Sequence, residues 1–111
     1  MPAVSMMQVD QVTTAVIHDG DTEDVYICAD SDIAWRRVGN QMVEWLPRMI
    51  SDWGPDEEAL AAFKEHIAKH EYDEAAELWS EMTNGEQYFS VDNSVVLTSE
   101  PEPAWPAGLE V

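Results

Sequence analysis

Two short segments near the N-terminus have the patterns of β-strands, the first because it is rich in β-branched residues and the second because its polarity alternates. They are Gln11 to His18 (QVTTAVIH) and Asp24 to Ala29 (DVYICA). Both patterns are typical of β-strands with one buried face. The polar stretch between them contains the pair Asp19-Gly20, a common signal for a tight turn between antiparallel strands. The pattern therefore predicts an N-terminal β-hairpin.

After the predicted hairpin, apolar residues recur at steps of three and four, which indicates a helix. Asp30 or Ser31 is a suitable N-cap for it. Pro47 stands where a long helix would kink or end, and the segment Ser51 to Pro55 (SDWGP) is predicted to separate this helix from the next. The apolar positions of this first helix are Trp35, Val38, Met42, Trp45 or Leu46, and Met49.

Two further helices are predicted in the middle of the chain. Pro55 suits a first helical position. The residues that follow it are acidic and also favour a helix N-terminus. The next helix is expected from about Tyr72 to Thr83, ending at Asn84-Gly85, a left-handed C-cap. In the second helix Leu60, Phe63 and Ile67 are expected to form the buried stripe, and in the third Tyr72, Ala75, Ala76, Trp79 and Met82 lie on one side.

β character returns from Glu86 to Thr98 (EQYFSVDNSVVLT). Asp92-Asn93 could form a hairpin turn or lie within one long strand, and we favour the hairpin. Residues 1–98 are predicted to form a single α+β domain in the order β-β-α-α-α-β(-β), with about three helices packed on one face of a small antiparallel sheet. The acidic tail of residues 99–111 contains three prolines and is expected to be extended or mobile.

Composition narrows the class of protein. A chain of 111 residues with 45% hydrophobic residues, five of them tryptophan, can bury one core without a metal or a disulfide. Cys28 is the single cysteine, so no intramolecular disulfide can form, and a reducing compartment is expected. Met1 to Asp10 does not resemble a signal peptide, and no apolar segment is long enough to span a membrane. We expect a cytoplasmic protein, located in the bacterial host if a phage encodes it.

Charge is the unusual property of this chain. It carries 23 acidic and 5 basic residues, a net charge of −18. Asp52 to Glu86 alone contains 11 acidic and 2 basic residues. In the predicted third helix Glu74, Glu77 and Glu81 recur at steps of three and four, which places their carboxylates about 4.5–6 Å apart along the axis. DNA phosphates recur every ~3.4 Å along each strand, so this row offers a loose match to the nucleic-acid backbone.

No motif in the chain indicates catalysis, and we expect neither an enzyme nor a cofactor. His66 and His70 have the spacing at which two helical histidines can bind one metal ion. The pattern lacks the HExxH signature, and it would need a third ligand such as Glu65, Glu71 or Asp73. We therefore predict no metal site.

As a class, the chain resembles the small acidic inhibitors that phages and mobile elements encode against host defence. These include anti-CRISPR proteins and DNA-mimic anti-restriction proteins. The resemblance rests on size, charge, the missing enzyme motifs and the succession of QVTTAVIH, DVYICA and AWRRVGNQMVEWL. It contains no family signature, so it transfers no functional residue to this chain.

The first hypothesis is an inhibitor that occupies the basic groove of a nucleic-acid-binding complex, a CRISPR effector first and a restriction enzyme next. Such a protein would bind neither nucleic acid nor membranes. Its contacts would be Asp56, Glu57, Glu58, Glu74, Glu77 and Glu81.

The second hypothesis is a non-mimic interaction module, an adaptor or subunit that docks through aromatic residues. Its candidates are Tyr26, Trp53 and Trp105. A homodimer is one form of this hypothesis.

Overall fold

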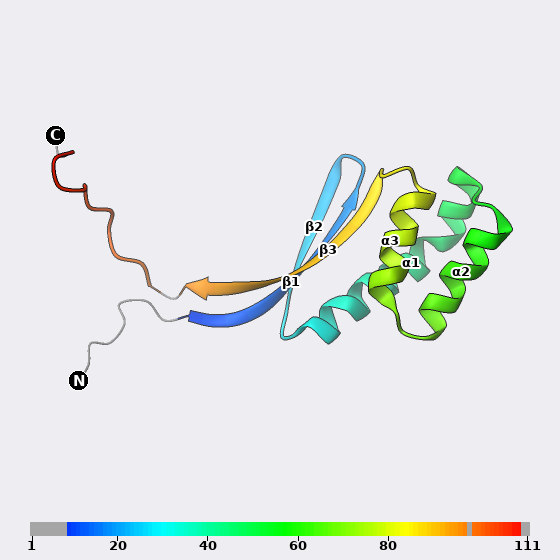
Figure 1. Cartoon of the computed structure of the whole chain (residues 1–111), viewed down its shortest axis with the longest axis horizontal. Coiled ribbons are helices and arrows are strands. Elements are labelled where there is room, and N and C mark those ends of the chain that lie inside the picture. Colours follow the sequence, from blue (N-terminus) through cyan, green and yellow to red (C-terminus); the bar gives the residue numbers. More distant parts are fainter. Residues whose placement is uncertain (1–8, 98, 110–111) are drawn as a thin grey trace.

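A three-stranded antiparallel sheet and three helices make up the fold in the computed structural model, which describes residues 9–97 and 99–109 (Figure 1). Strand β1 (Val9–Asp19) is central, between β2 (Thr22–Cys28) and β3 (Gln87–Leu97). The turn from β1 to β2 passes through Gly20, whose positive φ suits glycine. The α+β class, the N-terminal hairpin and the order β-β-α-α-α-β are confirmed.

The C-terminal β segment is one strand, so the preferred hairpin at Asp92-Asn93 is wrong. β3 pairs with β1 without interruption, from Asp19 opposite Gln87 to Val9 opposite Leu97. Asn93 stands opposite Thr13, whose Oγ1 donates a hydrogen bond to Asn93 Oδ1 at 3.2 Å. The polar residues that suggested a turn therefore form cross-strand pairs, which stabilise the extended strand.

The paired ends of β1 and β3 extend beyond β2 as a two-stranded arm. Pairing of β2 stops where Cys28 faces Thr13, whereas β1 and β3 remain paired as far as Val9 and Leu97. Residues 99–109 contain no helix or strand and lie on the side of the arm away from the helices (Figure 1). Both described ends of the chain are thus remote from the helical part.

Helix α1 (Ser31–Trp53) begins at Asp30, whose side chain accepts a hydrogen bond from the Ile33 N–H. Pro47 lies inside this helix without ending it. The left-handed Gly54 terminates the helix by donating its N–H to the Ile50 carbonyl.

Helices α2 (Glu57–Ala68) and α3 (Tyr72–Met82) follow. Asp56, not Pro55, marks the start of α2, because its carboxylate accepts the Ala59 N–H at 2.7 Å and takes the N-cap position. The prediction that Pro55 is the first helical residue is therefore wrong by two positions. Asn84 and Gly85 have positive φ just after α3, where a left-handed stop was predicted.

The core lies between one face of the sheet and the helices. Phe63 of α2 packs against Trp79 of α3, with ring centroids 5.3 Å apart. The single cysteine, Cys28, is part of this core. The buried members of the main cluster are Ala15, Cys28, Ala34, Val38, Met42, Met49, Phe63, Ala75, Ala76 and Trp79.

A chain of buried and partly buried hydrogen bonds fixes α3 to the sheet. Trp79 Nε1 donates to Gln87 Oε1, and Gln87 Nε2 donates to Asp19 Oδ1, both at 2.8 Å. The fully buried Thr83 hydroxyl accepts the Gln87 backbone N–H at 3.2 Å. These bonds satisfy polar groups that would otherwise be buried without partners, and they orient the outer side of α3.

The start of α3 is held against α1 by a close approach at Gly39. A Cβ atom on Gly39 would lie 2.6 Å from the Tyr72 ring, so only glycine leaves room for this contact. Among the residues that the structure describes, no helix covers the far face of the sheet, where Val25 is 58% and Ile27 74% exposed. Within residues 9–97 and 99–109, no helix has both the length and the apolar character needed to cross a membrane.

Candidate functional site

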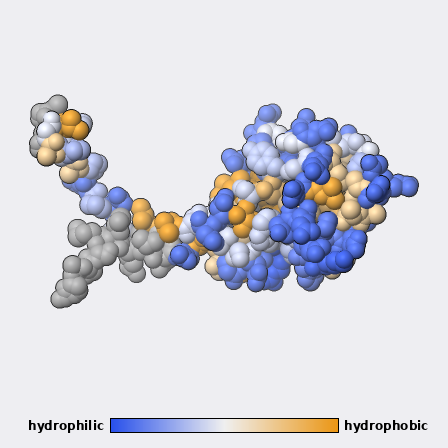
Figure 2. All heavy atoms as spheres, in the orientation of Figure 1, coloured by the Kyte–Doolittle hydropathy of each residue, from blue (hydrophilic) through white to orange (hydrophobic). Residues whose placement is uncertain are grey.

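The acidic side chains lie on the surface. Among residues whose exposure is described, every aspartate and glutamate is exposed except Asp19 and Glu71, which are half-buried. Hydrophilic residues predominate over the helical end of the molecule in the view of Figure 2. The acidic side chains of the described residues are therefore presented to solvent and to any partner.

Helix α3 separates its acidic and apolar residues on opposite sides. Glu74, Glu77 and Glu81 are exposed, as the sequence predicted. Ala75, Ala76 and Trp79 are buried against the rest of the domain. The helix contains no lysine or arginine, so no positive side chain of its own interrupts the acidic row.

Helix α2 contributes acidic residues next to the last turn of α3. Asp56, Glu57 and Glu58 are all exposed at its start. A shallow groove of about 220 Å³ is lined by Asp56 together with Glu81, which places the start of α2 beside the end of α3. The structure therefore brings the two predicted acidic groups together at this end of the helical pair, while Glu74 lies at the other end.

Basic residues near this surface are few. Lys69 Nζ lies 2.8 Å from Glu65 Oε1, four residues earlier on α2. The hydrogen bond and charge of Lys69 lower the pKa of the Glu65 carboxyl, and Glu65 in turn raises the pKa of Lys69. Lys64 is exposed on α2, and the three arginines are on α1. The acidic row on α3 thus stays largely uncompensated.

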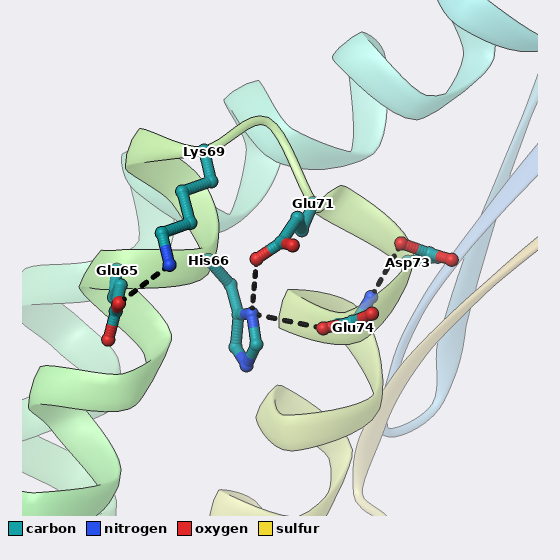
Figure 3. Close-up of polar contacts among 6 residues, drawn as sticks. All are labelled: Glu65, His66, Lys69, Glu71, Asp73 and Glu74. Carbon is teal, nitrogen blue, oxygen red and sulfur yellow. Dashed lines mark hydrogen bonds and ion pairs between the residues drawn. The ribbon is translucent and has the colours of Figure 1, made fainter.

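His66, Glu71 and Glu74 form a polar cluster where α2 turns into α3 (Figure 3). His66 Nδ1 lies 2.9 Å from Glu71 Oε1 and 3.2 Å from Glu74 Oε2. The turn that creates this cluster is closed by a hydrogen bond from the Glu71 N–H to the His66 carbonyl at 2.8 Å. These three residues offer one nitrogen and two carboxylate groups to a metal ion.

The sequence-based pairing of His66 with His70 is not what the structure shows. His70 lies beyond the end of α2 with a positive φ of 61°, and its ring stacks on Tyr72 at a centroid distance of 5.6 Å. The sequence suggests Glu71 as a possible third ligand, but it suggests Glu74 only as a partner contact. One feature of the sequence could have indicated the site. Glu71 stands immediately before a helix, where the other two helices have a capping aspartate.

The aromatic candidates occupy different parts of the molecule. Tyr26 packs against the core, with the Arg37 guanidinium 5.2 Å from the centre of its ring. Trp53 is half-buried at the end of α1 and also contacts the core. Trp105 lies in the tail and is 65% exposed. The structure does not gather these three side chains into one patch.

A second groove, of about 510 Å³, lies between the first turns of α1 and the turn that precedes α3. Arg36 gives it a positive side chain, unlike the row on α3. Its lining residues are Asp32, Trp35, Arg36, His70, Tyr72 and Asp73.

In comparisons with known proteins, no family model, curated protein or solved structure matches the chain. The functional argument therefore rests on the charge and geometry of the helical surface.

Proposed function

We propose that this protein is an acidic inhibitor that occupies the basic nucleic-acid-binding groove of a host defence complex. A CRISPR effector is the first target and a restriction enzyme the second. The observation that carries the proposal is the exposed row of Glu74, Glu77 and Glu81 on a helix without basic residues. A groove of lysine and arginine that binds phosphates would attract this row by the same charge interaction.

The way α3 is anchored supports this role. An inhibitor that imitates a nucleic-acid backbone must present its charges in a defined arrangement, because ordering flexible side chains on binding lowers affinity. Trp79 and its hydrogen bond to Gln87 fix the inner side of α3. The backbone positions of the row are therefore set before binding, although the carboxylates themselves remain solvated. Direct binding to nucleic acid is disfavoured by like charge.

The test measures how strongly the protein inhibits DNA binding by a purified CRISPR effector complex and, separately, by a restriction enzyme. The triple variant Glu74→Lys, Glu77→Lys and Glu81→Lys should weaken inhibition by at least about 100-fold, because like charges facing each other cost several kcal/mol. Raising NaCl to about 0.5 M should also weaken inhibition by the wild-type protein, because the Debye length is then only about 4 Å and exposed charges attract each other less.

The matched control reverses as many charges elsewhere: Asp92→Lys, Glu100→Lys and Glu102→Lys. These residues are exposed on β3 and in the tail. The control should retain most of the inhibition if the α3 row makes the contact. Equal losses in both triple variants, with normal circular dichroism, would show that net charge alone matters and that α3 is not the binding surface.

A second candidate function is a non-mimic interaction module, favoured by the uncovered face of the sheet. Val25 and Ile27 are exposed on the edge strand β2, and exposed apolar side chains of this kind mark docking surfaces when they cluster. Binding through this face would survive high salt and would be lost in Ile27→Lys while the triple α3 variant still bound. These results would contradict the inhibitor proposal and support the interaction module.

A further inference from the structure

Three potential metal ligands converge at the turn between α2 and α3. His66 Nδ1, a Glu71 oxygen and a Glu74 oxygen all lie within 4.8 Å of one another. They come from the last turns of α2, from the residue before α3 and from the first turn of α3. Figure 3 shows both carboxylates directed at the same nitrogen of the His66 ring.

Hydrogen bonding alone accounts poorly for this arrangement. A ring nitrogen carries at most one proton, yet two carboxylates approach His66 Nδ1, at 2.9 and 3.2 Å. The carboxylates also repel each other, which disfavours bringing both to one proton. A tetrahedral metal ion with bonds of about 2.0–2.2 Å holds its ligand atoms about 3.3 Å apart. The two distances from His66 Nδ1, 2.9 and 3.2 Å, are close to that value, and the two carboxylate oxygens lie within 4.8 Å of each other.

Glu71 stands immediately before α3, at the position where the other two helices have a capping aspartate. Asp30 and Asp56 cap α1 and α2 by accepting backbone N–H groups. Glu71 holds the corresponding position before α3 but makes no capping hydrogen bond through its side chain. Its carboxylate turns to His66 instead. Such a departure from a local rule is expected where a residue serves a site rather than the helix.

We infer that His66, Glu71 and Glu74 bind a divalent transition-metal ion, for which Zn²⁺ is the best match. A nitrogen ligand disfavours Mg²⁺ and Ca²⁺, which prefer all-oxygen sites, and one imidazole with two carboxylates suits zinc. The three side chains are 28%, 40% and 55% exposed, so an ion can enter from solvent. A fourth position remains for water or for a side chain of a partner.

The bound ion would tie the end of α2 to the start of α3. His66 and Glu74 belong to different helices, so their shared ion would cross-link the helical pair at the end opposite Asp56. This inference goes beyond the proposed inhibitor function and does not rest on it, since it concerns the free protein.

The experiment titrates the full-length protein with Zn²⁺ alone by isothermal calorimetry, and with Co²⁺ followed by its visible absorption. We expect one ion per chain in each case. The double variant Glu71→Gln and Glu74→Gln should lose at least about 100-fold in affinity, because neutral amides replace two charged ligands. His66→Ala should abolish the cobalt spectrum, and excess Mg²⁺ should not displace zinc.

Two controls separate the site from general cation binding by an acidic surface. Glu77→Gln with Glu81→Gln removes as much charge from α3, and His70→Ala removes the neighbouring histidine; both should bind zinc as the wild type does. Cys28→Ser should also retain binding, because the thiol is buried in the core. Unchanged zinc affinity in His66→Ala, or equal losses in the two glutamine pairs, would overturn the inference. Circular dichroism of each variant establishes that it is folded.

Discussion

Helices α2 and α3 are adjacent, similar in length and rich in acid, but they are attached to the domain in different ways. α3 buries Ala75, Ala76 and Trp79 and is hydrogen-bonded to the sheet through Gln87. α2 has Phe63 as its one buried residue, packed on Trp79. The contrast indicates that α3 is part of the hydrophobic core, whereas α2 is attached to the domain largely through its contacts with α3.

This difference matters for the acidic surface. The carboxylates on α3 are presented from a backbone that cannot move without disturbing the core. Those at the start of α2 depend on fewer buried contacts, so local opening of α2 should need less free energy than unfolding of the domain. Substitutions that act on one helix and not on the other test this difference.

The largest effect is expected from Trp79→Ala. It leaves a cavity beneath α3 and removes the donor to Gln87 Oε1, so the free energy of unfolding should fall by about 5 kcal/mol. Urea unfolding followed by circular dichroism measures the change. Trp105→Ala is the matched control, because that side chain is 65% exposed, and it should alter stability little. Similar stability of the two variants would contradict the central role given to Trp79.

Phe63→Ala should have the next largest effect, about 3 kcal/mol, at the lower end of the range for a buried aromatic side chain. The loss should be concentrated in α2, since Phe63 is the buried residue of that helix. Amide hydrogen exchange should become faster in α2 than in α3 and β1. Uniformly faster exchange throughout the domain would show instead that the two helices unfold as one unit.

The smallest effect is expected from Asp56→Ala, which removes the N-cap of α2. Loss of the hydrogen bond to the Ala59 N–H should destabilise the protein by about 1 kcal/mol. Thermal unfolding at matched pH gives the comparison with Glu57→Ala, an exposed acidic residue in the first turn that is not the N-cap. If Glu57→Ala were equally destabilising, the loss would come from charge at the helix start and not from capping.

The sequence predicted the elements well where local patterns decide them. The β-branched residues of QVTTAVIH, the alternation in DVYICA and the turn at Asp19-Gly20 were sufficient to predict the hairpin. The spacing of Phe63, Trp79 and their neighbours was sufficient to predict the helices. The C-terminal strand was misread because Asp92 and Asn93 have turn propensity, which pairing with β1 overrides. A local pattern contains no information on that partner.

The candidate site was predicted only in part for a similar reason. Exposure of Glu74, Glu77 and Glu81 follows from helical periodicity. The His66 cluster depends on the turn after Ala68, where the left-handed His70 brings Glu71 back to His66. Spacing along the sequence suggested His70 as the partner, because it assumed that the helix continued through that residue.

The pairing of Val9 with Leu97 has a practical consequence for engineering. The two described ends of the folded part meet on neighbouring strands, so a short linker could join them. New termini could then be opened at Gly54, in the exposed connection between α1 and α2, giving a circular permutant. Conversely, a reporter domain attached at Val9 or Leu97 would sit at the end of the arm, away from the acidic helices.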